Sequence, residues 1–93
     1  MIKISVEAVE RAVRRTAETV MRAAKEDCPV RTGRLKNSIA LKSDGDEAEV
    51  YTDVEYAAAV ELGTSRQRPQ PFLSRGIAKG AEAAGKIFVE ELL

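Results

Sequence analysis

The chain has 93 residues with 15 basic and 15 acidic side chains, one cysteine and no histidine. This length predicts one domain over residues 1–93. Because histidine is missing, Ser-His-Asp and Cys-His catalytic sites are excluded within one chain, and the single Cys28 excludes an internal disulfide and a cysteine-based zinc site. The sequence shows no signal-peptide pattern and no apolar run of membrane-spanning length. Composition therefore favours a protein that is not an enzyme, with no catalytic residue, cofactor, metal or membrane partner.

Charges cancel overall but are segregated along the chain. From Arg11 to Lys36 there are eight basic residues against three acidic ones, from Asp44 to Glu61 seven acidic and no basic ones, and from Arg66 to Lys79 four basic and no acidic ones. Such blocks either solvate different faces or form a contact in which the basic edge of one copy meets the acidic edge of the next. Heterologous contacts of that kind generate rings. The predicted subunit-interface residues are Arg11, Arg15, Arg22, Asp44, Asp46, Glu47, Arg66 and Arg68.

Residues 5–27 are predicted to form an amphipathic helix that Ser5 caps and Pro29 ends. Its apolar face has side chains at spacings of three and four, namely Val6, Val9, Val13, Ala17, Val20 and Ala24. A separate strip of small side chains would let another helix approach closely, and it consists of Ala8, Ala12, Thr16, Thr19 and Ala23. Cys28 is expected to be a small, partly buried residue at the end of the helix.

A hairpin is predicted over residues 38–53, after a short helical turn that Thr32 caps and in which Gly33 lets the backbone approach a neighbour. Alternation of apolar and polar residues indicates two strands, and Asp44-Gly45-Asp46 is typical of the turn between them. A lone two-stranded hairpin is marginally stable. Either further strands lie near residues 29–37 or 54–62, or another subunit completes the sheet.

The last third of the chain predicts a short helical or irregular segment over 56–62, an exposed loop over 64–71 and a helix over about 72–92. Gly63 is expected to be a left-handed cap. In the final helix, the residues predicted to share the packing face are Leu73, Ile77, Ala84, Ile87 and Phe88. Gly76 and Gly80 are predicted to hold the backbone close to the small strip of the first helix. The fold class is therefore α+β, with a long N-terminal helix and a C-terminal helix packed on a small antiparallel sheet.

Three segments carry a resemblance to a known family: residues 29–39 (PVRTGRLKNSI), 56–64 (YAAAVELGT) and 69–73 (PQPFL). In this order they resemble the gene-product-ten-like family of Hong Kong-type siphophages, whose members show a proline, Thr-Gly-x-Leu-x-x-Ser-Ile, Tyr-Ala with Glu-x-Gly-Thr, and Pro-Phe-Leu. The matching residues are Pro29, Thr32, Gly33, Leu35, Ser38, Ile39, Tyr56, Ala57, Glu61, Gly63, Thr64, Pro71, Phe72 and Leu73.

These motif residues also have a structural interpretation. The expected core anchors are Leu35, Ile39, Tyr56, Val60, Phe72 and Leu73. Glu61 is expected to bond backbone amides near Gly63 or to pair with Arg34, Arg66 or Arg68.

The resemblance implies a tail-terminator-like fold and a virion protein that acts in tail completion or as a head–tail connector at the neck. It also implies a ring of copies, sixfold by family expectation, with connector and tail proteins as partners and DNA passing nearby. The location would be the virion, and the host cytoplasm during assembly. The chain is shorter between its strands than many members and lacks an aromatic residue between Tyr-Ala and Glu-x-Gly, which leaves ring size and partner open. The alternative is a small cytosolic nucleic-acid-binding or regulatory module that uses the Arg-rich first helix.

Overall fold

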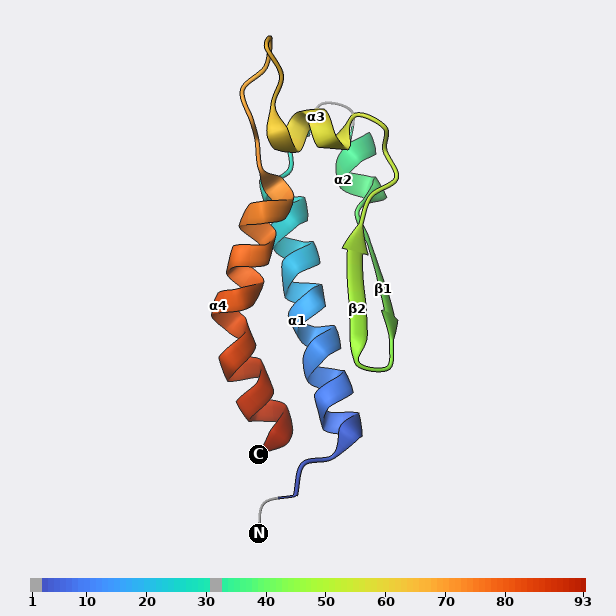
Figure 1. The fold of residues 1–93 in the computed structure, drawn as a ribbon, viewed down its shortest axis with the longest axis vertical. Helices are drawn as coiled ribbons and strands as arrows, with labels where there is room; N and C mark the ends of the chain where they lie inside the picture. The colour runs from blue at the N-terminus through green and yellow to red at the C-terminus, as the bar shows by residue number, and fades with distance from the viewer. Residues whose placement is uncertain (1–2, 31–32) are drawn as a thin grey trace.

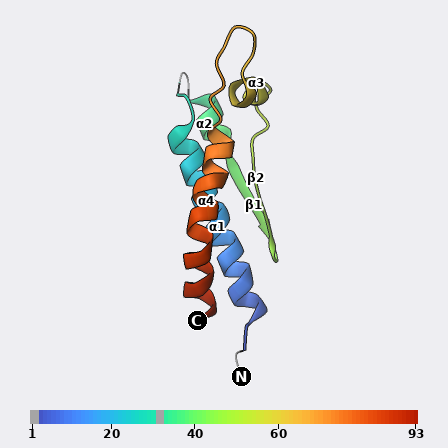
Figure 2. The same ribbon diagram turned by 60° about the vertical axis from the view of Figure 1, so that its left-hand side comes forward.

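A computed structural model describes residues 3–30 and 33–93. Its elements in chain order are α1 (Val6–Asp27), α2 (Arg34–Ser38), β1 (Ala40–Asp44), β2 (Glu47–Tyr51), α3 (Ala57–Leu62) and α4 (Phe72–Leu92). The molecule is elongated, 58 × 21 × 18 Å. The helices α1 and α4 run antiparallel, the hairpin lies along α1, and α2 and α3 sit at one end (Figures 1 and 2). The predicted α+β class, with two long helices and a small antiparallel sheet, is confirmed.

The first helix begins where predicted, because the Ser5 hydroxyl accepts a hydrogen bond from the Ala8 N–H at 3.0 Å. It ends at Asp27, where Cys28 turns to an extended conformation before Pro29. The predicted apolar face is wrong at Val6, which is 66% exposed. The buried residues of α1 are small, namely Ala8, Ala12, Ala17, Ala23 and Ala24. Short side chains are buried here because α4 approaches the backbone of α1 closely.

Glycines make that approach possible. A Cβ on Gly76 would lie 2.8 Å from the Val20 carbonyl oxygen and 3.1 Å from the Ala24 Cβ, and a Cβ on Gly80 would collide with the Val20 side chain. The close approach of the two backbones is therefore confirmed, but the predicted partner is wrong. The nearest contacts are with Val20 and Ala24 of the apolar face, and the small strip contributes only the Thr16 carbonyl oxygen, 3.6 Å from a Cβ on Gly80.

The packing face of α4 differs from the predicted one. Its buried residues are Phe72, Gly76, Gly80 and Ile87. Ile77 was expected on this face but is 60% exposed. The reason is geometric: Ile77 follows Gly76, and one residue turns an α-helix by about 100°. The side chain of Ile77 therefore points away from α1.

The sheet consists of two strands in the part of the chain that the structure describes. Residues predicted as possible further strands form α2 and α3 instead, and the hairpin is shorter than 38–53 because Ser38 ends α2. Gly45 has a φ of +61°, and among the described residues only glycines have a positive φ. A positive φ at only the first of two loop residues matches a type II′ turn, which suits the twist of a hairpin.

Two further glycines adopt positive φ where the chain enters and leaves the end region. Gly33 precedes α2 with a φ of +81°, while Thr32, the predicted cap, lies outside the described residues. Gly63 ends α3 with a φ of 76° and a ψ of 173°. This conformation is extended in ψ, so the predicted left-handed helical cap is wrong. An added Cβ on Gly63 would lie 2.7 Å from the Pro69 nitrogen, so glycine is required because a second backbone segment passes there.

Helix α4 offers a matched pair of glycines to test the contact with α1. We expect Gly76→Ala to lower the free energy of unfolding by about 1–2 kcal/mol, because the new methyl group overpacks the Val20 backbone. Gly85→Ala should raise it by about 0.5–1 kcal/mol, because nothing lies within 4 Å and alanine favours a helix. Urea unfolding followed by circular dichroism measures both changes. Equal effects of the two substitutions would contradict the close contact.

Candidate functional site

The apolar motif residues meet in one buried cluster at the end of the molecule where α2 and α3 lie (Figure 1). The cluster consists of Ala24, Cys28, Leu35, Ile39, Val54, Ala57 and Phe72. Met21, Val50, Tyr56, Val60 and Leu73 pack against it and are partly buried. Phe72 is fully buried, and burying such a side chain contributes about 1.5–3 kcal/mol. Residues from all three motif segments therefore hold the end of the fold together.

Cys28 belongs to this cluster and is 4% exposed. Burial raises the pKa of the Cys28 thiol, which disfavours the reactive thiolate. Its role is therefore packing at the end of α1.

Glu61 caps α4 from a different element. Its carboxylate accepts hydrogen bonds from the Leu73 N–H at 2.9 Å, the Ser74 N–H at 3.3 Å and the Ser74 hydroxyl at 2.6 Å. Pro71, at the N-cap position, makes no side-chain capping bond. A carboxylate at a helix N-terminus satisfies free N–H groups and interacts favourably with the helix dipole. Glu61 thus bonds backbone amides, but at the start of α4 and not near Gly63.

Residues 64–71, here called the arm, project from the same end (Figure 1). Thr64 and Gln67 bond each other's backbone at 2.9 and 3.3 Å and close a tight turn at the tip. The base is anchored because the Gln70 N–H donates to the Val60 carbonyl at 2.8 Å. Arg66 and Arg68 are both exposed on the arm. The predicted exposed loop therefore has a defined shape.

A groove of about 810 Å³ lies between α2, α3 and the arm. Its lining includes the apolar residues Pro29, Val30, Leu35, Tyr56 and Val60, together with Arg34, Arg66, Gln67 and Gln70. Arg34 donates two hydrogen bonds to the Glu55 carboxylate, at 2.9 and 2.8 Å, and its guanidinium lies 5.5 Å from the centre of the Tyr56 ring. The hydrogen bonds from Arg34 hold the pKa of the Glu55 carboxyl below its ordinary value. This wall of the groove is therefore held in place by paired charges.

The predicted acidic residues lie together at the turn of the hairpin. Asp44, Asp46 and Glu47 are exposed, and Asp44 lies directly across from Glu47 in the strand register. None of the three is in an ion pair within the part of the chain that the structure describes. A hollow of about 580 Å³ separates these residues from Val13 of α1. We call residues 44–47 the acidic tip.

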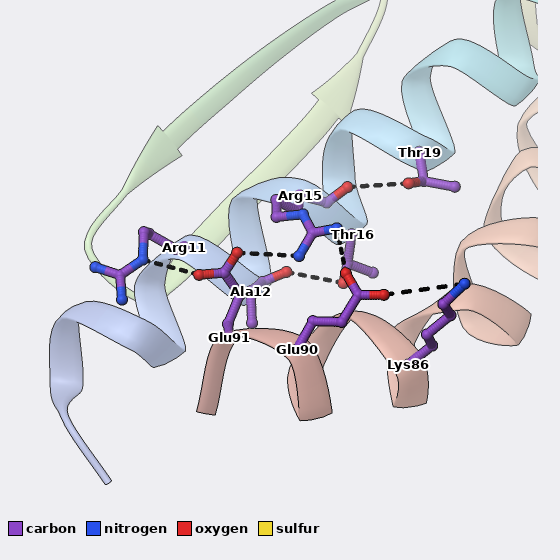
Figure 3. Close-up of polar contacts among 8 residues, drawn as sticks. All are labelled: Arg11, Ala12, Arg15, Thr16, Thr19, Lys86, Glu90 and Glu91. Carbon is purple, nitrogen blue, oxygen red and sulfur yellow. Dashed lines mark hydrogen bonds and ion pairs between the residues drawn. The ribbon is translucent and has the colours of Figure 1, made fainter. Parts of the chain in front are cut away.

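The basic residues of α1 are not all on a free surface. Arg11 donates to Glu91 at 2.9 Å, and Arg15 donates to Glu91 and Glu90 at 3.0 Å each (Figure 3). Both arginines are thus engaged with the last turn of α4, which the sequence analysis did not foresee. Arg22 is exposed and forms no ion pair with another described residue. This engagement weakens the alternative in which the arginines of α1 bind nucleic acid.

A further ion pair ties the other ends of these helices together. Arg75, near the start of α4, lies 2.9 Å from Asp27, the last residue of α1. The antiparallel helices are thus linked by opposite charges at both ends.

Residues 3–30 and 33–93 contain neither a candidate metal site nor a candidate membrane span. These residues hold no cluster of three or more acidic, cysteine or histidine side chains that could bind a metal ion. No helix among them has both the length and the apolar character needed to cross a membrane.

Removing the Glu61 cap should destabilise the fold measurably. We expect Glu61→Ala to lower the free energy of unfolding by about 1–2 kcal/mol, because the first turn of α4 loses its acceptor. Glu82→Ala, on the exposed face of the same helix, is the matched control and should have a small effect. Urea unfolding measures both variants. If they unfold alike, Glu61 is not a cap.

The Arg11–Glu91 and Arg15–Glu91 pairs should make stability depend on pH. Hydrogen bonds from Arg11 and then Arg15 hold the pKa of the Glu91 carboxyl below its ordinary value of 4.5. The folded-state pKa is depressed, so ionised Glu91 stabilises the fold above the unfolded-state pKa, and this contribution is lost as pH falls through the folded-state pKa. Glu91→Gln should therefore be less stable than the wild-type protein at neutral pH, and the difference should vanish in acid.

Urea unfolding over a pH series tests this expectation. Glu82→Gln, which removes no ion pair in the described chain, serves as the control and should unfold like the wild-type protein at neutral pH. A Glu91→Gln deficit that persists or grows on acidification would show that ionised Glu91 is not responsible.

Comparison with known families relates this architecture to phage proteins. Residues 3–63 match the family described as "Bacteriophage HK97-gp10, putative tail-component". The match spans α1, α2, the hairpin and α3, and includes the first motif segment and the second as far as Gly63. No curated protein and no solved structure gives a significant match. Because the family match covers more than half of the chain, the chain belongs to the HK97-gp10-like family, and the motif residues Leu35, Ile39 and Ala57 within the match lie in its buried core.

Proposed function

We propose that this protein is a structural subunit that completes the tail end, or joins head to tail at the neck, and works in a ring of copies. Its family is one of phage tail components, which indicates a place in the virion and contacts with other tail proteins. The finer role, the ring and its sixfold symmetry are our proposal. Assembly in the host cytoplasm and a channel that DNA traverses belong to the same proposal.

The observation that carries the proposal is the separation of unpaired opposite charges. The acidic tip lies at the hairpin turn, while Arg66 and Arg68 lie on the arm at the end of the molecule (Figure 1). Neither group is in an ion pair within the described chain. Two different complementary surfaces on one subunit support heterologous contacts, which close into rings or grow into filaments.

A passive role agrees with how the motif residues are used. Leu35, Ile39, Ala57 and Phe72 are buried in the core, and Glu61 caps a helix. These roles build a rigid subunit and supply no reacting group. We therefore propose that the protein is not an enzyme and acts through contacts with copies of itself and with connector and tail proteins.

Deleting the gene in the phage or prophage that encodes this protein should yield heads and tails that fail to join, and a plasmid copy should restore joined particles. Electron microscopy of lysates and infectious titre measure the outcome. Joined, infectious particles without the gene would refute the proposed role.

The charge-based ring has its own test in the same system. A copy with Asp44→Lys, Asp46→Lys and Glu47→Lys should fail to restore joining, because the acidic tip no longer attracts a basic neighbour. Glu18→Lys, Glu26→Lys and Glu82→Lys provide an equal charge change away from the tip and should restore it. Full complementation by the tip variant would exclude the charge mechanism while leaving the family role intact.

A further inference from the structure

The groove beside the arm combines an apolar lining with basic charge. Val30 lines it and is 62% exposed, and Tyr56 and Val60 contribute further apolar surface. Arg66 also lines the groove, and Arg68 follows on the same arm. Arg34 is already engaged with Glu55, whereas Arg66 and Arg68 form no ion pair with a described residue. The arm therefore offers a basic rim to an acidic partner that carries a small amount of apolar surface.

The acidic tip carries the charge that is opposite to that of the rim. Asp44 and Glu47 face each other across the strands, and like charges directly opposite each other are destabilising. A fourth carboxylate approaches the three of the tip from α1, because a Cβ on Gly45 would lie 3.9 Å from Glu10 Oε1. Lys42, the basic residue of the hairpin, lies across from Glu49 and not from these acids. An external cation would relieve the repulsion among the carboxylates of the tip.

The tip also has a shape that suits a groove. The two strands are joined by the two residues Gly45 and Asp46, so the turn is narrow, and Gly45 has no side chain. The hollow on its α1 side shows that the tip is not packed tightly against its own chain.

The tip and the groove of one copy lie in different parts of the molecule. The hairpin runs from α2 along α1, and its turn points away from the arm (Figure 1). One copy therefore cannot place its own tip in its own groove. Each copy has one tip and one groove, so a contact between two copies leaves one free tip and one free groove. Further copies can therefore add, and the chain of copies closes into a ring where the rotation between neighbours allows it.

We propose that the acidic tip of one copy docks in the groove of the next copy, with Arg66 and Arg68 facing Asp44, Asp46 and Glu47. This inference rests on the proposed function, because it specifies the contact that builds the ring. Arg11 and Arg15 of α1 are engaged with Glu90 and Glu91. Arg22 of α1 is exposed and forms no ion pair with a described residue, but it does not line the groove, which favours the arm as the basic partner.

Equilibrium disulfide exchange between two variants tests the contact on the full chain. One variant carries Asp46→Cys and the other Gln67→Cys, a groove residue, while buried Cys28 stays in place in both. The two are mixed at millimolar concentration in a glutathione redox buffer, and linked peptides are quantified by mass spectrometry. We expect the test mixture to yield several-fold more of the disulfide between positions 46 and 67 than a control mixture of Glu82→Cys with Gln67→Cys yields of the disulfide between positions 82 and 67. Each variant alone should give no excess of disulfide-linked dimer, because a contact between tip and groove does not bring two copies of the same position together.

The dependence of the cross-link yield on salt and on the charge of the arm provides a second test. The excess should disappear at ~1 M salt, where the Debye length is about 3 Å, and when the Gln67→Cys chain also carries Arg66→Glu and Arg68→Glu. Reversing Arg14 and Lys79, exposed residues away from the groove, is the matched control and should preserve the excess. Equal yields from the test and control mixtures, or an excess that Arg66→Glu and Arg68→Glu leave unchanged, would overturn the docking proposal.

The gene-deletion experiment separates this result from the proposed function. A cross-link excess with normal particles in the deletion strain would sustain the docking contact and refute the virion role. Failed joining in the deletion strain without a cross-link excess would sustain the role and refute this contact.

Discussion

The close contact between α1 and α4 is the constraint on which the rest of this structure depends. Gly76 and Gly80 bring the α4 backbone against Val20 and Ala24, at distances that leave no room for a side chain on either glycine. A glycine inside a helix costs about 1 kcal/mol relative to alanine. The packing of the two helices against each other offsets that cost, although few large side chains lie in their interface. Aromatic residues make up only 4% of the chain. The interior is therefore filled by bringing the two helix backbones close together and not by large side chains.

Once the two helices are aligned, the end region assembles around Phe72. This residue begins α4, and Leu35, Ile39 and Ala57 surround it from α2, the start of the hairpin and α3. Glu61 then joins α3 to the first turn of α4 through three hydrogen bonds. The positive φ of Gly63 and its proximity to Pro69 direct the chain into the arm. The shape of this end therefore depends on polar and backbone constraints as well as on apolar burial.

The charges of the molecule divide into those used within the fold and those left for a partner. Arg11, Arg15, Arg34 and Arg75 each bind a carboxylate of the same chain. Exposed pairs of this kind contribute little to stability, but they determine which arginines are available for binding. The acidic tip and the arm carry opposite charges that form no ion pair among the described residues, and the two lie at well-separated positions along the molecule. For the ring of copies that we propose, this distribution matters more than the net charge of zero.

Local patterns were enough to predict the main elements, because caps, breakers and periodicity act over a few residues. Ser5, Pro29, the Asp44-Gly45-Asp46 turn and the two prolines of the arm led to the two long helices, the hairpin and the exposed loop. The same patterns identified the core anchors Leu35, Ile39 and Phe72 and the close-packed glycines. They predicted a short helical turn before the hairpin, but not that it extends to Ser38, and they did not predict that Val6 and Ile77 face solvent.

The sequence by itself therefore determined where helices and strands form and which segments carry the family motif. Only the tertiary structure decided which partner each polar residue has. Arg11 bonds Glu91, 80 residues away, and Glu61 bonds the amide of Leu73 in another helix. Such pairings depend on how two helices lie against each other and on which face of each is buried. Those quantities are fixed by packing across the whole chain and leave no local pattern in the sequence.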